Sequence, residues 1–410
     1  MRIMEEQLSE MRQNPLEGWI FGKTGGKSIL EYQLERIKDT FRLVTENSAF
    51  YSKRYCGFQY GRTGCINDFE RLPFVTAEDI VQYGPQMLCV HQNEIERIVT
   101  LKTSGTAGEP KRVYFTAADQ ELTIDFFDVG MRCIVDEKDN FMILLPYKAP
   151  GSVGDLLRAG LERIGCSVYP YGIVEDYRDA GGFIQRNNIT SLVGTPVQVL
   201  KLAELTKAYG LDIELSSVLL SADFVPDAVV RRLESLWKCK VFEHYGMTEM
   251  CFGGGVYCDC LAGYHMREAD LYFEIISDSG ESLPDGEYGE IVFTTLTRKG
   301  MPLVRYRTGD YGRFKRERCC CSAELRVMEK VRRRMDGGIS IGNRIFHISD
   351  FDEMMFSCDK IVDYSIAFDK GEISIKAMTA GDVMVNESKQ ERLVKRKILK
   401  GGGDEASGWI

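Results

Sequence analysis

Long hydrophobic runs and an excess of positive charge are both absent from this sequence. No apolar stretch approaches the roughly 20 residues that a membrane-spanning helix needs, and the run Phe141–Leu145 has the length of a core strand. The chain carries 52 Lys and Arg against 61 Asp and Glu, a net charge of −9. Binding to nucleic acid needs a basic face that neutralises phosphates. We therefore expect neither a nucleic acid nor a membrane as partner.

No secretion signal is expected from the N-terminal residues. The first residues, MRIMEEQLSEMRQ, are acidic and contain no apolar segment of the kind found in signal peptides. Thirteen cysteines without such a signal predict a reducing cytoplasm, where thiols or a metal site are expected rather than disulfides.

What is present is the composition of a soluble globular protein with a sizeable core. Of the 410 residues, 44% are hydrophobic and 28% are charged. This length suits one large domain followed by a smaller one. No internal repeat is evident.

Hydrophobic periodicity predicts the main elements. Apolar residues at spacings of four and three from Leu30 to Val44 predict an amphipathic helix, and Thr76 with Asp79 predicts a capped helix start. Between residues 117 and 310, short apolar runs alternate with helical patterns such as Asp227–Trp237, which predicts a mainly parallel sheet covered by helices. The predicted strands are Phe141–Leu145, Ser167–Tyr171, Ile189–Val193, Val218–Leu220 and Lys240–Phe242.

The predicted secondary structure changes near residue 271. Strand-like runs Leu271–Ile276, Gly289–Thr295 and Leu303–Arg307 are joined by turn residues, so this part is expected to be antiparallel and β-rich. A small α+β unit follows from about residue 331. The predicted fold class is therefore α/β, with a large N-terminal domain of parallel βα sheets, an antiparallel β-rich subdomain and a small α+β C-terminal domain.

One loop between two predicted strands has residues suited to bind phosphate. Glycines let backbone N–H groups turn inward, hydroxyls add donors and a lysine adds charge. The loop consists of Thr103, Ser104, Gly105, Thr106, Ala107, Gly108, Glu109, Pro110 and Lys111. A plain Gly/Ser/Thr hairpin loop is the alternative. A rival stretch, Gly22–Ser28, looks like a Walker A loop, but Phe21 stands where its first glycine is needed, so we interpret it as a polar loop.

Four strings resemble motifs of the adenylate-forming (acyl-CoA synthetase-like) superfamily, in the family's order. Residues 103–111 are similar to TSGTTG-x-PK, with Ala107 in place of a threonine. His244–Glu249 is similar to YG-x-[ST]E, Tyr306–Asp310 to YRTGD, and Arg334–Asp336 to the R-x-D that begins the mobile C-terminal domain.

The resemblance covers nearly the whole chain and implies an ATP site. Segments 263–276 and 296–310 are similar to the phenylacetate–CoA ligase-like branch of AMP-dependent CoA ligases. The 103–111 loop would hold the β- and γ-phosphates, Ser221–Asp223 would meet adenine, and Asp310 would accept from both ribose hydroxyls. The implied cofactor-binding residues are Thr103, Ser104, Gly105, Thr106, Gly108, Lys111, Ser221, Ala222, Asp223, Tyr245, Gly246, Thr248, Asp310 and Arg334.

The implied catalytic residues are Lys111, Thr248, Glu249 and Arg334. Attack of a carboxylate on ATP spreads charge over phosphoryl oxygens, so catalysis depends mainly on positioning and electrostatic stabilisation. Thr248 would bond the α-phosphate, and Glu249 would hold Mg²⁺, a hard cation that prefers carboxylate oxygen. Arg334 would support ribose and phosphate, although three arginines in a row commonly form a solvated face.

The acid-binding pocket has a weaker signal. Tyr147 stands where the family has an aromatic substrate-gating motif, and it could stack on an aryl group or pack in the core. Gly194 and Phe252 are further candidate walls. None of these residues names a substrate.

Four residues predict a second, structural site. Cys258, His265, Cys319 and Cys321 form a Cys₃His set, the composition of a closed tetrahedral zinc site. Relatives in this branch place a Cys…His and a Cys-x-Cys-Gly at equivalent points, whereas Ser322 replaces the glycine here. Cys260 and Cys320 are spare thiols that blur the ligand choice. Reduced cysteines that lie together by chance are the alternative.

The superfamily rotates a small C-terminal domain about a hinge. Asp336 matches that hinge, but Gly337 replaces the family's second aspartate. The usual catalytic lysine follows a glycine near the C-terminus, and no Gly-Lys dipeptide occurs after residue 331, so we assign no residue to this role. We expect residues 1–330 to form the adenylation domain and residues 331–410 a small lid domain, and we leave open that the lid is incomplete.

The sequence thus predicts a cytoplasmic AMP-forming acid–thiol ligase. It would activate a small carboxylic acid, for which a phenylacetate-like aryl acid is a candidate, and transfer the acyl group to coenzyme A. Amide formation with an amine or amino acid, and a non-catalytic adenylate-binding protein, are the alternatives. The expected cofactors are ATP/AMP, Mg²⁺, coenzyme A as co-substrate and a structural Zn²⁺. A homodimer is left open.

Overall fold

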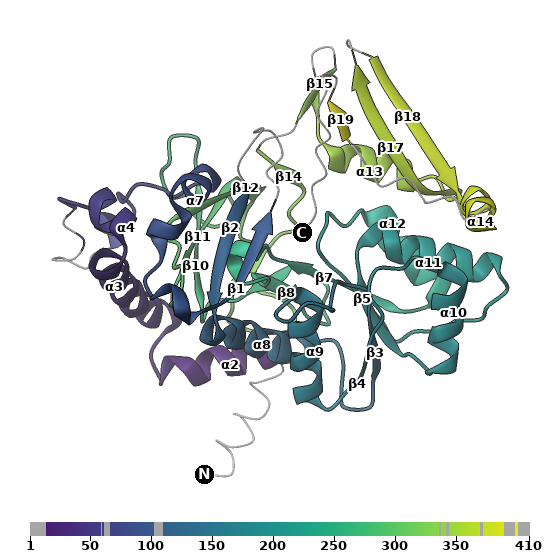
Figure 1. Ribbon diagram of the computed structural model, residues 1–410, viewed down its shortest axis with the longest axis horizontal. Coiled ribbons are helices and arrows are strands. Elements are labelled where there is room, and N and C mark those ends of the chain that lie inside the picture. Colours follow the sequence, from purple (N-terminus) through teal and green to yellow (C-terminus); the bar gives the residue numbers. More distant parts are fainter. Residues whose placement is uncertain are drawn as a thin grey trace.

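The computed structural model describes residues 14–58, 60, 66–101, 110–335, 338–341, 344–369, 372–388 and 398–400. Figure 1 shows three regions. N-terminal helices flank an antiparallel sheet, a larger sheet carries helices α10 to α12, and the C-terminal strands lie above α11 and α12.

The N-terminal helices begin with capped turns. A capping box between Ser28 and Glu31 starts α3, which buries Ile37, Phe41 and Val44 as predicted. Leu30 was predicted on the same face but is 55% exposed, because it lies in the first turn, outside the packed part of the helix. The elements are α2 (Pro15–Thr24), α3 (Ile29–Asn47), α4 (Ala49–Arg54), α6 (Ile66–Phe69), α7 (Ala77–Tyr83), η1 (Gly84–Met87) and η2 (Gln92–Glu94).

Two further sequence predictions hold in this region. Thr76 and Asp79 form the capping box that starts α7. The stretch Gly22–Ser28 ends α2 and starts α3, with Gly25 at φ 62 as the C-cap. It is therefore a helix–helix connection, as its interpretation as a polar loop implied.

The larger sheet has eight strands in the order β13-β9-β8-β7-β6-β5-β3-β4. The run from β7 to β4 is parallel, and β5 and β6 are buried along their whole length, as expected for strands covered on both faces. The predicted parallel strands and the helix Asp227–Trp237 are confirmed. The strands are β3 (Asn140–Ile143), β4 (Ser167–Pro170), β5 (Ser191–Gly194), β6 (Ser217–Leu220), β7 (Lys240–Tyr245), β8 (Gly255–Tyr257), β9 (Tyr264–Met266) and β13 (Val327–Met328). The helices are α8 (Ala117–Met131), α9 (Val153–Ile164), α10 (Tyr177–Arg186), α11 (Pro196–Ala208), α12 (Asp227–Trp237) and η3 (Thr248–Met250).

The β-rich part forms an antiparallel sheet in the order β10-β11-β12-β14. The predicted strand Leu303–Arg307 is misplaced, because Arg305 has a φ of 50 and its buried guanidinium pairs with Glu274, so the strand starts only at Tyr306. The strands are β10 (Leu271–Ile276), β11 (Gly289–Thr295), β12 (Tyr306–Gly312) and β14 (Arg333–Arg334). A separate antiparallel hairpin pairs β1 (Ile95–Leu101) with β2 (Lys111–Thr116).

The C-terminal unit is α+β, as predicted. Its central strand β17 pairs antiparallel with β18 and parallel with β19. Phe356, Tyr364 and Val383 share one buried cluster with residues of α11 and α12, so this unit packs on the outer helices of the larger sheet. Its elements are β15 (Ile339–Ile341), β16 (Arg344–Phe346), α13 (Ile348–Phe356), β17 (Ile361–Asp369), β18 (Glu372–Thr379), α14 (Ala380–Ser388) and β19 (Ile398–Lys400).

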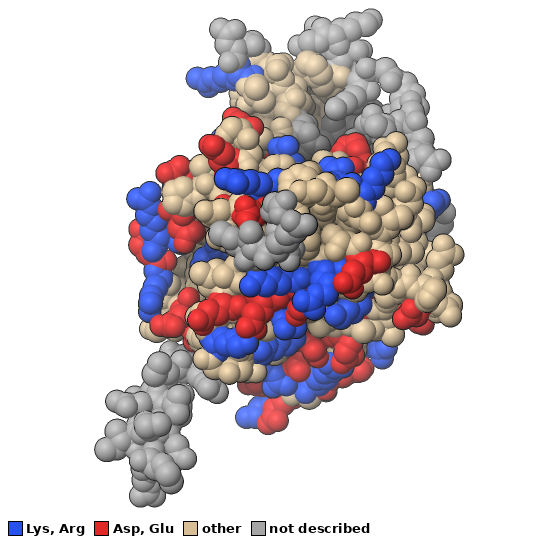
Figure 2. Space-filling model, turned by 90° about the vertical axis from the view of Figure 1, so that its left-hand side faces the viewer, with Lys and Arg blue, Asp and Glu red and all other residues tan. Residues whose placement is uncertain are grey.

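The surface carries charges of both signs. Figure 2 shows Lys and Arg interspersed with Asp and Glu on the side of the molecule where α3 lies. Exposed ion pairs such as Lys27–Glu35 and Arg36–Asp39 contribute to this mixture. Within the residues that the structure describes, no helix is long and apolar enough to cross a membrane.

Candidate active site and metal centre

Two tyrosines connect the motif that ends β7 to the motif on β12. The hydroxyl of Tyr245 donates to Asp310 Oδ2 at 2.9 Å, and the hydroxyl of Tyr306 donates to Glu249 Oε1 at 3.1 Å. Burial first, and then the neighbouring carboxylate, raise the pKa of each tyrosine well above its usual value, so both remain donors. Both carboxylates are thereby fixed at the carboxyl end of β7, where sheets of this kind place their ligands.

Lys111 lies beside Glu249. It is the first residue of β2, and its Nζ contacts Glu249 Oε1 although 138 residues separate the two in sequence. Arg298 donates to the backbone oxygens of Glu249 at 3.1 Å and Tyr114 at 2.8 Å, which fixes η3 against β2. The other predicted loop residues, Thr103, Ser104, Gly105, Thr106 and Gly108, lie outside the described residues.

Arg334 lies next to Asp310. The two residues are directly paired across β14 and β12, with Arg334 Nη1 3.8 Å from Asp310 Oδ1. Arg334 Nη2 also donates to Thr308 O at 3.2 Å, while its side chain remains 59% exposed. The guanidinium can therefore reach a ligand that binds at Asp310. The predicted hinge residue, Asp336, lies outside the described residues.

The segment predicted to meet adenine follows β6. Ala222 has a φ of 72, a conformation that a residue with a Cβ seldom adopts and that is common at functional sites. Ser221 Oγ lies 2.9 Å from His244 Nδ1. Gly246 is needed for space, because a Cβ there would lie 2.6 Å from Phe252 O. Thr248 is buried one position before Glu249.

An apolar cavity of about 30 Å³ adjoins this segment. Its walls come from α8, α9 and the strand ends, and include Phe126, Phe127, Met131, Leu145, Val193 and Val256, with Ser221 and His244 on one side. Sequence reasoning missed it because ordinary apolar positions on helices carry no motif.

The three residues predicted as pocket walls are not among those that line this cavity. Tyr147 lies near Gly172, and Phe252 stacks on Phe115 with ring centroids 5.8 Å apart. Gly194 follows Val193, which does line it. Contacts of these three residues with a substrate remain predictions.

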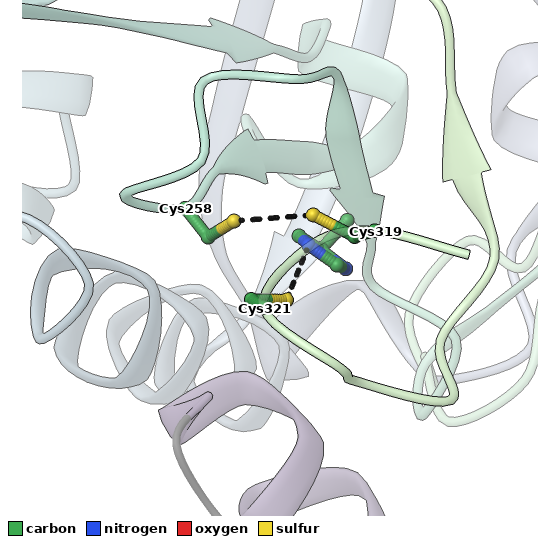
Figure 3. A group of neighbouring side chains, drawn as sticks. Cys258, Cys319 and Cys321 are labelled. Carbon is green, nitrogen blue, oxygen red and sulfur yellow. Dashed lines mark hydrogen bonds between the residues drawn. The ribbon is translucent and has the colours of Figure 1, made fainter. Parts of the chain in front are cut away.

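The predicted Cys₃His set converges at one point. Figure 3 shows the sulfurs of Cys258 and Cys319 directed toward each other, with the side chain of Cys321 close by. His265 completes the group. Cys258 Sγ, just after β8, lies 3.6 Å from Cys319 Sγ. Cys321 Sγ lies 3.4 Å from His265 Nε2. All four ligand atoms lie within 4.8 Å of one another.

Two of these separations are close to the edges of a tetrahedral zinc site. Zn–S bonds of about 2.3 Å and Zn–N bonds of about 2.0 Å require edges of about 3.8 Å between sulfurs and about 3.6 Å between sulfur and nitrogen. Burial lowers the pKa of His265 to about 4, so the ring is neutral near pH 7, the form that binds a metal. The residues therefore fit a zinc ion.

The expectation of free thiols is wrong at two positions. Cys260 and Cys320, which the sequence left as spare thiols, form a disulfide beside this cluster. The pairing depends on how two loops far apart in sequence approach each other, which spacing alone does not give. It also removes both residues as competing ligands.

The fold and the two buried carboxylates define a nucleotide-dependent ligase of the adenylate-forming class. The family model described as AMP-binding enzyme matches residues 76–296. This match covers more than half of the chain, so the chain belongs to the AMP-binding enzyme family. The sequence-based prediction of the superfamily is thus confirmed.

Curated relatives and solved structures agree with this assignment. The phenylacetate–coenzyme A ligase of Pseudomonas putida is 29% identical over 70% of this chain and 67% of its own length. That of Thermus thermophilus is 28% identical over 70% of this chain and 66% of its own length. The chain thus spans about two thirds of these relatives.

Solved structures confirm the fold class. A 2-hydroxyisobutyryl-CoA ligase in the postadenylation state matches with a TM-score of 0.75 and 19% identity, over 87% of this chain and 82% of that one. The same enzyme with an acyl-adenylate and CoA in the thioesterification state gives 0.70 and 20%, over 93% and 89%.

Proposed function

We propose that this chain is an AMP-forming ligase that joins a carboxylic acid to coenzyme A. In the first half-reaction, a carboxylate oxygen attacks the α-phosphorus of ATP and pyrophosphate leaves. In the second, the thiol of coenzyme A attacks the acyl carbonyl and AMP leaves. The observation that carries the proposal is the convergence of Lys111, Glu249 and Asp310, held together by Tyr245 and Tyr306. Relationship to phenylacetate–coenzyme A ligases supports the choice of acceptor.

The site residues divide into two groups by the part of ATP that they bind. Asp310 accepts from the ribose hydroxyls, and Arg334, its partner across β12 and β14, contacts ribose and phosphate. The ammonium of Lys111 neutralises charge on the phosphates, and the hydroxyl of Thr248 orients the α-phosphate. Glu249 is the residue that would hold Mg²⁺, which would supply positive charge against the phosphate oxygens.

Zn²⁺ at Cys258, His265, Cys319 and Cys321 is the second part of the proposal. Four candidate ligand atoms within 4.8 Å of one another, three of them on buried residues, support a structural role, because a Cys₃His set leaves no position open for a reacting molecule. The ion would tie the loop before β13 to the end of β8 and to β9.

Residues 1–330 act as the adenylation domain and residues 331–410 as a lid. The entry of the chain into the lid as β14, paired with the strand that carries Asp310, supports this division. By sequence similarity, Asp336, two positions after Arg334, is the residue that would serve as the hinge.

The test is pyrophosphate release by the purified chain with Mg-ATP, coenzyme A and a panel of aliphatic and aryl acids. Acid-dependent release together with an acyl-CoA product supports the proposal. Release that needs an amine or amino acid instead of coenzyme A would assign amide formation. Nucleotide binding without release for any acid would leave an adenylate-binding protein and refute the ligase.

A further inference from the structure

His244 is the unusual polar residue beside the apolar cavity. It lies on β7, directly before Tyr245, whose hydroxyl bonds Asp310. Because neighbouring residues of a strand point to opposite faces, the same strand sends Tyr245 toward the nucleotide residues and His244 toward the cavity. Its ring is flanked by Phe126 and Phe127, with centroids 6.2 and 6.3 Å away.

One nitrogen of this ring has a partner and the other has none. Nδ1 is 2.9 Å from Ser221 Oγ, whereas Nε2 is buried and makes no hydrogen bond within the described structure. Most buried polar atoms are bonded, so an unpaired nitrogen beside a cavity is a place where a polar group of a ligand can bind. The remaining cavity walls offer it only apolar side chains such as Met131, Leu145 and Val193.

The position of the ring proton decides whether Nε2 donates or accepts a hydrogen bond. If the Ser221 hydroxyl donates to Nδ1, then Nε2 carries the proton and donates; if Nδ1–H donates to Ser221, then Nε2 accepts. A hydroxyl group satisfies either form because it can donate and accept. A methyl group satisfies neither form.

We infer that His244 determines specificity, by hydrogen-bonding through Nε2 to a hydroxyl on the otherwise apolar part of the acid. The inference rests on the proposed ligase function and narrows its substrate class from carboxylic acids in general to hydroxy-substituted acids. His244 thus acts on the choice of acid, while the phosphate-binding residues act on ATP whatever the acid is.

The experiment compares matched acids that differ by one hydroxyl, namely phenylacetate with its three ring-hydroxylated isomers and isobutyrate with 2-hydroxyisobutyrate. Pyrophosphate release gives kcat/KM for each. We expect the protein to favour a hydroxylated member at least about tenfold, as for a buried polar group that one substrate pairs and the other leaves unpaired. His244→Leu should remove that preference, and His244→Gln, which keeps a polar amide in similar reach, should retain part of it.

Met131→Leu is the matched control, because it changes the cavity wall without changing polarity. It should alter the rates of both members of a pair alike and leave their ratio unchanged. Equal rates for both members with the unaltered protein, or a preference that survives His244→Leu, would overturn the role of His244 while the ligase activity stands. Absence of pyrophosphate release with every acid would overturn the proposed function itself.

Discussion

The hydroxyl of Tyr306 donates to Glu249 Oε1 across 57 residues of sequence, at 3.1 Å. Glu249 is almost completely buried, and Lys111 contacts the same oxygen. The orientation of this carboxylate is therefore set by one neutral and one charged donor before any ligand binds. The fold itself thus positions the Glu249 carboxylate, without the Mg²⁺ that we propose it binds.

Tyr306→Phe removes the neutral donor and leaves the ring in place. We expect kcat/KM for pyrophosphate release to fall about tenfold and stability to fall by about 1 kcal/mol, the usual contribution of one hydrogen bond. Tyr311→Phe is the control, because Tyr311 is on the same strand but its hydroxyl bonds an exposed backbone oxygen. Equal losses in both variants would mean that the strand, and not the bond to Glu249, is responsible.

Asp310→Asn tests ribose recognition. A carboxylate accepts from two hydroxyls, whereas an amide offers one acceptor oxygen. The unaltered protein should use 2′-deoxy-ATP about tenfold less well than ATP, from one lost charge-assisted hydrogen bond. The variant should be slower with both nucleotides but discriminate less between them. A variant that discriminates as strongly as the parent would remove Asp310 from the ribose site.

Metal analysis tests the zinc centre. We expect one zinc per chain in the parent, little in Cys319→Ser and a clear drop in Tm for that variant, since a structural zinc contributes folding free energy. Cys239→Ser is the control, because Cys239 is also a buried thiol but belongs to the core cluster under α12. Loss of zinc from both variants, or from neither, would contradict the ligand set.

Arg232 fastens the C-terminal unit to α12. Its guanidinium pairs with Glu204 at 2.6 Å and donates to the backbone oxygens of Ile361 at 2.6 Å and Asp359 at 2.9 Å. Arg232→Met should expose the unit to proteases and cost about 3 kcal/mol, because Glu204 loses its partner. Arg231→Met, on the exposed side of the same helix, should change neither. Unchanged proteolysis in Arg232→Met would show that apolar packing alone holds the unit.

Because of His244, we expect the free energy of unfolding to decrease in acid. Burial first, and then the nearby charge of Arg267, lower the pKa of His244 to about 4, against about 6.5 in an unfolded chain. The unfolded chain therefore takes up the proton first, and stability present above about pH 6.5 is lost as the pH falls toward 4. Between pH 7 and pH 5 this loss is about 2 kcal/mol.

Urea unfolding at both pH values checks this expectation. His244→Gln should show a smaller loss of unfolding free energy than the parent, by about that amount. If His244→Gln is as acid-sensitive as the parent, the His244 ring is not held neutral by the fold.

The nucleotide site was more predictable from sequence than the acid pocket. Glu249 and Asp310 stand in short contiguous strings that resemble family motifs, so the sequence could single them out as candidates. The reciprocal bonds of Tyr245 and Tyr306 could not be read from those strings, because they depend on how β12 lies against the end of β7.

The rest depends on tertiary contacts without a local signature. The cavity walls come from apolar positions of α8 and α9 that look like ordinary core, and Arg232 looks like any surface arginine of a helix. The clustering of Cys258, His265, Cys319 and Cys321 could be predicted because Cys and His in this pattern are distinctive, whereas the Cys260–Cys320 pairing could not.

The pairing of Asp310 with Arg334 gives the chain a built-in coupling. Asp310, which would hold the nucleotide, lies on β12. The two-residue strand β14, which leads into the C-terminal unit, pairs with β12 at the edge of the same sheet. If ligand binding favours the paired state of that strand by some factor, the paired state must favour ligand binding by the same factor. Amide hydrogen exchange at β14 would therefore report whether nucleotide is bound. The same measurement would report the position of the C-terminal unit, because β14 leads into it.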